Sequence, residues 1–294
     1  MSVKENWKQE YLYRTFSQHT RRKDMENYVI NAIWARLDDL AIQPVSQQYV
    51  RRPNGYALID LYFPQISYGI ECDEAYHKNN SARDVQREID LVHTLSACNG
   101  DEVVIRRVDA TLNADDLHAC IREIVKEIRQ KIAEKGEFLS PWLSSNEKWG
   151  LIQQKGVLSV EDAYSFTTIS EVCKKCFGKE ETYRIQRCYF RIDSDFMLWC
   201  PKLAIHLPDG SKKAQSHGWV NELAADWSTI IEYNENMSLK ISSEHINRPR
   251  ATFAKSKDEL GENAYRFVGV FQWSGRMADG RHVYKRTSDR VRLK

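Results

Sequence analysis

The sequence predicts two domains, an N-terminal α/β domain with a mixed sheet and a mainly β C-terminal domain. Its 294 residues are about twice the length of a typical domain of roughly 150 residues. Over about the first 135 residues, apolar positions with helical spacing alternate with short strand-like runs. Beyond that point strand-like runs dominate, and six of the eight tryptophans lie between Trp142 and Trp273.

The N-terminal half is predicted to follow the order α-β-β-β-α-β-α. After Lys23, apolar residues recur every four positions and predict a helix over 23–40. Strand-like runs follow at 42–50, 56–63 and 68–73, separated by turns at Asn54-Gly55 and at 64–67. A helix over 82–98, a strand over 102–108 and a helix over 115–135 complete the domain.

The C-terminal half is predicted to form a curled sheet or barrel. The pattern changes near Gly136, so the predicted units are a first domain over 1–136, a linker over 137–146 and a second domain over 147–294. Strand-like runs occur at 183–192, 196–200, 228–233, 265–273 and 281–286. The run from Thr252 to Leu260 is predicted to be a helix.

Composition excludes several classes of protein. No apolar run approaches the ~18 residues that a membrane helix needs, and the polar start from Met1 to Thr15 predicts that no signal peptide is present. Seven cysteines, an odd number, favour reduced thiols in a cytoplasm. Cys173 and Cys176 have the spacing of a zinc site, but Cys188 and Cys200 do not, which favours buried thiols. The net charge of +2 does not by itself indicate a nucleic-acid-binding protein.

An acidic cluster is the strongest chemical signal in the first half. If Phe63 and Tyr68 close a hairpin, Asp60 lies directly opposite Glu71, with Cβ atoms about 5 Å apart. Asp73 follows Glu71 by two residues and therefore shares its face of the sheet. Three carboxylates are thus predicted to converge on one spot.

Facing like charges destabilise a sheet, so this arrangement favours a bound cation. Carboxylate oxygens suit Mg²⁺, which can activate water and stabilise charge in phosphodiester hydrolysis. His77, just past the strand, is a candidate base, and Glu26 on the first helix could add a further contact. Glu74 also fits a solvated helix start, but that alternative does not explain an aspartate inside an apolar strand. The candidate catalytic residues are Asp60, Glu71, Asp73, Glu74, His77 and Glu26, with Asp60, Glu71 and Asp73 as metal ligands.

A set of three side chains in the second half suits a flipped base. Trp219 offers a ring for stacking, while Asn221 and Glu232 offer an amide and a carboxylate for the hydrogen-bonding edges of the base. A carboxylate can accept from the N4 amino group of cytosine. The alternative is that the tryptophan belongs to the core and the two polar residues to the surface.

The predicted element order, with Asp60 and Glu71 on a hairpin, resembles the PD-(D/E)XK nuclease superfamily over residues 20–135. In that superfamily a lysine follows the second acid by two residues, whereas this position is Asp73 here. The departure favours a mechanism that relies more on the metal or on His77. A histidine in such a position resembles the very-short-patch-repair-like branch of the superfamily.

The whole chain resembles the 5-hydroxymethylcytosine-dependent restriction endonucleases, which join such a nuclease to a base-flipping domain similar to the SRA (SET- and RING-associated) domain. The matching segments are 25–31, 47–52, 63–65, 71–77, 176–178 and 265–271. The resemblance implies that Trp219, Asn221 and Glu232 bind 5-hydroxymethylcytosine, or its glucosylated form, in duplex DNA. It further implies cleavage at a distance from that base with Mg²⁺, a bacterial cytoplasmic location and a role in phage defence. Cutting both strands needs two nuclease centres, which favours a homodimer.

Other functions also fit the sequence. One is a structure- or mismatch-specific nickase with a generic DNA-binding second half, another is a modified-base binder with a silent nuclease, and a third is an RNA-binding second half of the PUA type. Basic residues at 21–23, 51–52, 106–107 and 281–294 are candidates for contacts with the DNA backbone. The last of these runs equally fits a solvated strand edge.

Overall fold

A computed structural model of the chain describes residues 6–17, 23–53, 55–73, 81–109, 111–179, 188–192, 196–206, 212–214, 217–236 and 248–294. The chain divides into two compact units. Unit 1 comprises residues 1–144 and 259–261, and unit 2 comprises residues 145–258 and 262–294. The division after residue 144 falls inside the stretch 137–146 that the sequence predicts as a linker.

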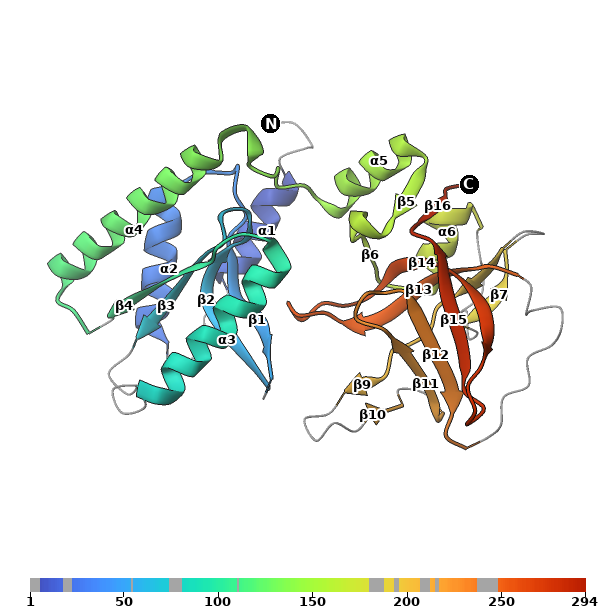
Figure 1. Cartoon of the computed structure of the whole chain (residues 1–294). Helices are drawn as coiled ribbons and strands as arrows, with labels where there is room; N and C mark the ends of the chain where they lie inside the picture. Colours follow the sequence, from blue (N-terminus) through green and yellow to red (C-terminus); the bar gives the residue numbers. More distant parts are fainter. Residues whose placement is uncertain are drawn as a thin grey trace. The chain divides into compact units, whose positions relative to one another are not determined.

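Unit 1 is a four-stranded mixed sheet with helices on both faces (Figure 1). Its strands, in spatial order, are β1 (Val45–Arg52), β2 (Gly55–Phe63), β3 (Tyr68–Asp73) and β4 (Val104–Asp109). The first three are antiparallel neighbours, and β4 runs parallel to β3. The helices are α1 (Asn6–Ser17), α2 (Asp24–Leu37), α3 (Ser81–Asn99) and α4 (Ala114–Lys135). None of the described helices is long and apolar enough to cross a bilayer.

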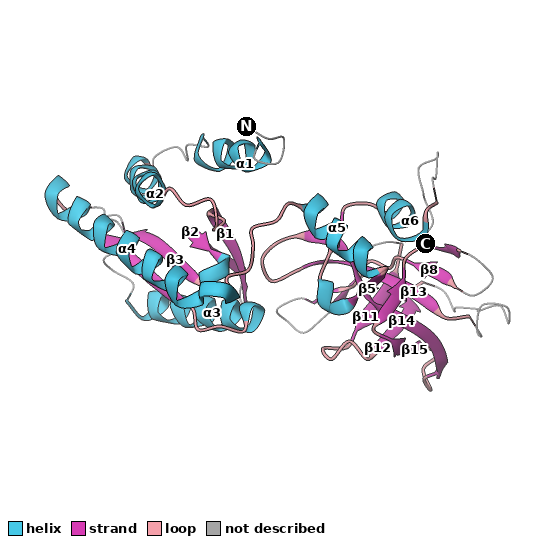
Figure 2. Cartoon of the chain, turned by 90° about the horizontal axis from the view of Figure 1, so that it is seen from above, coloured by secondary structure: helices cyan, strands magenta, loops and turns pink. Residues whose placement is uncertain are grey.

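Two apolar clusters hold these layers together. Helices α2 and α4 pack on one face of the sheet, where Ile33 and Ile121 meet Leu61 of β2. Helix α3 packs on the opposite face, where Leu95 meets Ile59. Figure 2 shows the strands between these helices. Burying apolar surface on both faces of a sheet is the main source of stability in such a layered domain.

The sequence predicts most of unit 1 correctly. Strand β3 has the predicted bounds, α3 and α4 each begin one residue before the predicted helix, and Phe63 pairs with Tyr68 as expected. Helix α1 is not predicted, because its polar sequence has little periodicity. Two of its rings, Trp7 and Tyr11, pack edge-on against Trp142 with centroids 5.3 Å apart in both pairs. Tertiary contact thus stabilises a helix that local sequence does not predict.

Unit 2 is built on an eight-stranded open sheet in the order β11-β12-β15-β14-β13-β8-β7, with β6 pairing on β14. Its described strands do not close into a barrel, so the sheet is the open form of the predicted curled sheet or barrel. The strands of this sheet are β6 (Ser165–Phe166), β7 (Tyr189–Arg191), β8 (Met197–Trp199), β11 (Trp219–Leu223), β12 (Thr229–Asn234), β13 (Arg250–Lys257), β14 (Asn263–Arg276) and β15 (His282–Ser288). Two small pairs join β5 (Val157–Ser159) to β16 (Arg290–Arg292), and β9 (Ile205–His206) to β10 (Lys212–Lys213).

The helix predicted from Thr252 to Leu260 is wrong, because residues 252–257 belong to β13 and residues 258–260 are neither helix nor strand. The strand runs antiparallel to β14 on one side and parallel to β8 on the other. Its residues from Arg250 to Ala254 are all buried. A strand buried on both faces lacks the alternation of apolar and polar residues by which strands are identified from sequence.

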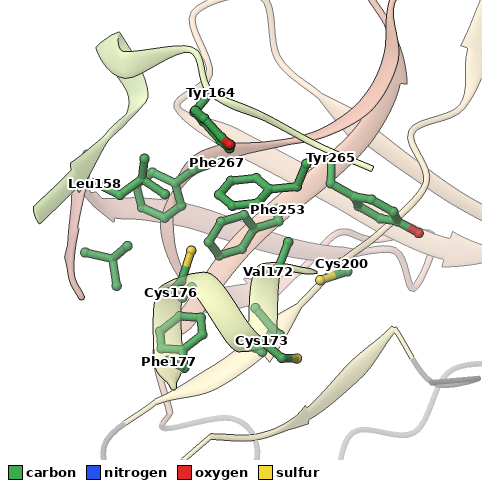
Figure 3. Close-up of a cluster of buried hydrophobic side chains, with 14 of the residues drawn as sticks. Leu158, Tyr164, Val172, Cys173, Cys176, Phe177, Cys200, Phe253, Tyr265 and Phe267 are labelled. Atoms are coloured by element: carbon green, nitrogen blue, oxygen red, sulfur yellow. The ribbon is translucent and has the colours of Figure 1, made fainter. Parts of the chain in front are cut away.

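Two helices, α5 (Ser145–Lys155) and α6 (Ile169–Phe177), complete unit 2. Helix α6 carries Cys173 and Cys176 into an apolar core, where they lie near Val172, Phe253 and Cys200 (Figure 3). Burial raises the pKa of the Cys176 and Cys200 thiols. These cysteines therefore act as small apolar core residues, as the sequence predicts.

We expect Phe253→Ala to lower the free energy of unfolding of unit 2 by about 3–5 kcal/mol, because it opens a cavity. The Phe253 ring packs against Phe166, Phe267 and Phe177, with centroids 5.5, 5.3 and 6.3 Å away. Urea unfolding of the whole chain measures the change. The control is Leu151→Ala, at a side chain that is 48% exposed, and it should change stability by less than about 0.5 kcal/mol. Equal losses in the two variants would contradict this account of the core.

Candidate functional site

Two buried carboxylates, Glu26 and Asp60, lie together in unit 1, and we call them the acidic pair. Gln47 bridges them, because its Nε2 donates to Oε1 of Glu26 at 2.7 Å and to Oδ1 of Asp60 at 3.1 Å. The Nζ atom of Lys23 lies 2.5 Å from Oε2 of Glu26 and 3.6 Å from Oδ1 of Asp60. The two carboxylates therefore share one amide donor and one cation.

An irregularity in β2 places Asp60 at this point. Residues two apart in a regular strand share a face, yet Ile59 packs on the α3 side of the sheet and Leu61 packs on the α2 side. The regular alternation of side chains between the two faces of the sheet therefore breaks at Asp60. Gln47, at the same level of β1, has a positive φ of 51°, and it lies between two regular pairs of the β1–β2 ladder. Such distortions re-aim side chains and are frequent beside functional sites.

The acidic pair and Lys23 compensate each other electrostatically. Burial raises the pKa of Glu26, and the nearby charge of Asp60 adds to the rise, while the hydrogen bond from Lys23 opposes it. Burial also acts against the charge of Lys23, but its contacts with the two carboxylates outweigh this effect and raise its pKa. The ammonium is therefore the counter-ion of two carboxylates that would otherwise repel each other.

Glu71 and Asp73, at the end of β3, lie among arginines instead. Nη2 of Arg87 on α3 is 2.8 Å from Oε1 of Glu71, and Nη2 of Arg107 on β4 is 3.5 Å from Oε2 of the same carboxylate. Nη1 of Arg107 also lies 3.2 Å from Oδ1 of Asp73, and its Nε lies 3.3 Å from Oε2 of Glu88. Burial raises the pKa of Glu71, and the two arginines oppose this rise.

The six residues predicted from the sequence as catalytic thus fall into separate groups. The β2–β3 pairing ends at Leu61 and Ile70, one residue short of the predicted pair of Asp60 and Glu71. Oδ2 of Asp60 accepts from the backbone N–H of Cys72 at 2.8 Å. The carboxylates of Asp60 and Glu71 bind different side chains. Asp60 joins Glu26, while Glu71 and Asp73 join the arginines. Glu74 and His77 lie outside the described residues.

The acidic pair fits the chemistry of a divalent metal. Within the described ranges, no group of three or more His, Cys, Asp or Glu side chains is arranged to hold a metal ion. Glu26 and Asp60 nonetheless offer neighbouring carboxylate oxygens, which Mg²⁺ prefers. Their compensation by a lysine ammonium shows that this position favours positive charge.

Sequence reasoning missed the roles of Lys23, Gln47 and Arg87. Lys23 precedes Glu26 by three residues, a spacing that brings helical side chains together. Gln47 could have been found from the register of the first hairpin, whereas nothing local signals the reach of Arg87 to Glu71. Other basic residues predicted to contact DNA form ion pairs within unit 1. These are Arg51 with Glu259, Arg52 with Asp90 and Arg106 with Glu127.

In unit 2, the structure brings Trp219, Asn221 and Glu232 onto one face of the β11–β12 pair. Asn221 lies directly opposite Glu232 in the antiparallel register, and Trp219 is two residues before Asn221 on the same strand. Residues two apart share a face, and directly opposed residues have Cβ atoms about 5 Å apart. The ring, amide and carboxylate predicted from the sequence are therefore neighbours in space.

Two hydrogen-bond acceptors face each other here. Asn221 is only 5% exposed, and its Oδ1 has no hydrogen-bond partner among the described residues. Its Nδ2 donates to the carbonyl of Lys202 at 3.4 Å. Glu232 is half-buried and accepts from the hydroxyl of Tyr284 at 3.0 Å. Burial raises the pKa of Glu232, while Arg250 and Tyr284 oppose the rise.

Arg250, at the start of β13, is a further residue of this face that the sequence does not indicate. Its guanidinium lies over the rings of Tyr284, Tyr189 and Trp199, with Cζ 4.2, 4.6 and 5.1 Å from the ring centres. It is only 4% exposed. An arginine in a core strand gives no recognisable local pattern, because the three rings come from three other strands.

Two family models match the chain, one in each unit. Residues 9–138 match the N-terminal domain of PvuRts1 I-like restriction endonucleases, and residues 151–293 match the SRA (SET and RING associated) domain. The chain joins a restriction endonuclease domain of the PvuRts1 I-like type to an SRA domain. It is also similar to a solved structure, the 5-hydroxymethylcytosine-specific restriction enzyme AbaSI, with 26% identity, a TM-score of 0.62 and coverage of 98% of each chain. No curated protein sequence matches the chain significantly.

These matches confirm the predicted fold classes and the pairing of the two domains. The acidic pair and the arginines around Glu71 belong to the restriction endonuclease domain. The face that carries Asn221 and Glu232 belongs to the SRA domain. Each domain therefore presents buried polar groups on one part of its sheet.

We expect the stability of Glu26→Gln, relative to the natural chain, to rise with pH between about pH 4 and pH 7. A carboxyl group with a raised pKa in the folded state stabilises that state fully only below its ordinary pKa of 4.5. This contribution is lost as the pH rises through the raised value, whereas glutamine does not titrate. Melting temperatures across the pH range measure the difference. The control is Glu123→Gln at an exposed position, whose difference in melting temperature from the natural chain should not change with pH. A difference between Glu26→Gln and the natural chain that falls as the pH rises would refute a raised pKa of Glu26.

Proposed function

We propose that the chain is a modification-dependent restriction endonuclease. Its SRA domain flips 5-hydroxymethylcytosine, or the glucosylated form, out of duplex DNA, and its N-terminal domain cuts the DNA at a distance from that base. The observation that carries the proposal is the pair of facing acceptors, Asn221 and Glu232, beside the ring of Trp219. The similarity to AbaSI, whose described specificity is 5-hydroxymethylcytosine, supports it.

The polar groups on this face suit the donors of a modified cytosine. The exocyclic N4 amino group of cytosine carries two N–H donors, and a hydroxymethyl group adds an O–H donor. Oδ1 of Asn221, which lacks a donor among the described residues, and the carboxylate of Glu232 can accept from these groups. Trp219 supplies a ring on which the extruded base can stack. Thymine lacks the N4 amino group, which supports selection of a cytosine.

In the nuclease domain, we propose that Asp60, Glu71 and Asp73 are the metal ligands and that Glu26, Glu74 and His77 complete the catalytic set. Bound Mg²⁺ would activate a water molecule and stabilise charge on the phosphate. Asp60 would contribute to holding it, and Glu26, which Gln47 joins to Asp60, would lie beside it. Arg87 and Arg107 pair with the Glu71 carboxylate and oppose the rise in its pKa that burial causes.

Separate base-binding and nuclease domains account for cleavage at a distance from the modified base. One nuclease domain cuts one strand, so we propose that two copies of the chain act together as a homodimer. Sedimentation of the chain on a duplex with one modified cytosine would show whether two copies assemble. A double-strand cut by a single copy would contradict this part of the proposal.

The base-binding proposal predicts that the chain cuts 5-hydroxymethylcytosine DNA with Mg²⁺ and spares a matched unmodified duplex. Digestion of duplexes that contain cytosine, 5-methylcytosine, 5-hydroxymethylcytosine or its glucosylated form, with the ends mapped, measures this preference. Asn221→Ala should lower the preference at least about 10-fold, because one good base contact contributes roughly 1–3 kcal/mol. The exposed Lys257→Ala is the control. Equal cutting of all four duplexes would refute the proposal.

The nuclease proposal predicts that Asp60→Asn lowers the cleavage rate at least about 100-fold, since metal-ligand chemistry contributes several kcal/mol to the barrier. Binding of the modified duplex, measured without Mg²⁺, should stay unchanged because the SRA domain is intact. Asp115→Asn, at an exposed position on α4, is the matched control and should cut at the natural rate. Full activity of Asp60→Asn would remove this residue from the catalytic set.

A further inference from the structure

Arg250 of the SRA domain is a buried cation inside an aromatic cage. The rings of Tyr284, Tyr189 and Trp199 surround its guanidinium, and its Nε has no hydrogen-bond partner in the described part of the chain. Aromatic faces attract a cation, but they do not neutralise its charge. A guanidinium stays protonated at any physiological pH, so this buried charge requires an anion nearby.

Glu232 is the carboxylate whose charge interacts with this cation. Attraction to Arg250 opposes the rise in the pKa of Glu232 that burial causes. Tyr284 joins the two residues, because its ring lies over Arg250 and its hydroxyl donates to Oε2 of Glu232 at 3.0 Å. The groups that face Glu232 are Asn221 on β11, His282 and Tyr284 on β15, Arg250 on β13, and Cys188 and Tyr189 at β7.

We propose that Arg250 is a positioning residue of the base-binding site, whose caged guanidinium holds Glu232 ionised and oriented toward the exocyclic amino group of a flipped modified cytosine. The inference rests on the base-binding function proposed above. An ionised carboxylate only accepts hydrogen bonds, whereas a protonated one carries an O–H donor. A donor there would face the N–H donors of the base. Arg250 is covered by rings and acts through Glu232 rather than by touching the base.

The first test measures DNA binding by the full chain without Mg²⁺. Fluorescence anisotropy gives the affinities for a 5-hydroxymethylcytosine duplex and a matched cytosine duplex from about pH 6 to about pH 9. In Arg250→Met, the affinity for the modified duplex should fall at least about 10-fold at the low end of this pH range and recover at higher pH. The midpoint of this profile should move upward by about one pH unit or more, because an adjacent opposite charge shifts a pKa by about 1–3 units.

Two further variants separate charge from packing. Arg250→Lys keeps the positive charge and should retain a profile close to that of the natural chain. Arg250→Met combined with Glu232→Gln should show no pH dependence, because the titrating group has been removed. A loss of affinity for the modified duplex that is equal at every pH in Arg250→Met would mean that the arginine only packs, and a natural profile in that variant would mean that it plays no part. Either result overturns the inference.

A second measurement on the free chain is independent of DNA recognition. Without Arg250 the pKa of Glu232 should rise further, so the melting temperature of Arg250→Met should fall increasingly below that of the natural chain as the pH rises. Adding Glu232→Gln should abolish this trend. If the natural chain shows no preference for modified DNA, the proposed function fails, and this thermal cycle still decides whether Arg250 controls Glu232. If Arg250→Met lowers the melting temperature by the same amount at every pH, whether residue 232 is Glu or Gln, Arg250 does not act on Glu232.

Discussion

Both candidate sites depend on one constraint, the need of a buried carboxylate for a compensating donor or cation. An uncompensated buried charge costs several kcal/mol, so a fold can keep such a group only where its own side chains hold it. Lys23 and Gln47 hold the acidic pair in the first domain. Tyr284 and Arg250 act on Glu232 in the second. The residues around each functional carboxylate are therefore as much a part of the site as the carboxylate itself.

The two domains meet this constraint in different ways. In the nuclease domain the cation of the acidic pair is a lysine that is 38% exposed, on a side chain long enough to move. Under the proposed function, a bound Mg²⁺ would take its place. In the SRA domain the cation is an arginine that is fixed by three rings and closed off from solvent. An exchangeable counter-ion suits a metal site, whereas a permanent one suits a site that recognises a neutral base.

Sheet geometry decides which side chains meet. In β2 the alternation of side-chain direction breaks at Asp60. This residue consequently binds Lys23, which precedes α2, and Gln47 of β1 rather than the arginines near Glu71. In the SRA domain the β11–β12 register is regular, so Asn221 lies opposite Glu232. A regular ladder can be extended from one known pair, and an irregular one cannot. The sequence grouped Trp219, Asn221 and Glu232 by their chemistry and predicted no strand at 219–223, so the β11–β12 register is a finding of the structure.

The sequence alone determined the order of elements from α2 to α4 in the nuclease domain and the β2–β3 register. These features follow from local periodicity, turn residues and strand pairing, which act between residues close in the chain. The sequence also suggested the set of Trp219, Asn221 and Glu232, from the chemistry of the side chains. The tertiary structure decided that β13 is a strand, that Lys23 and Gln47 hold the acidic pair, and that Arg250 lies within an aromatic cage. These outcomes depend on which distant segments pack together. Burial and charge compensation act through space, and no local pattern of residues encodes them.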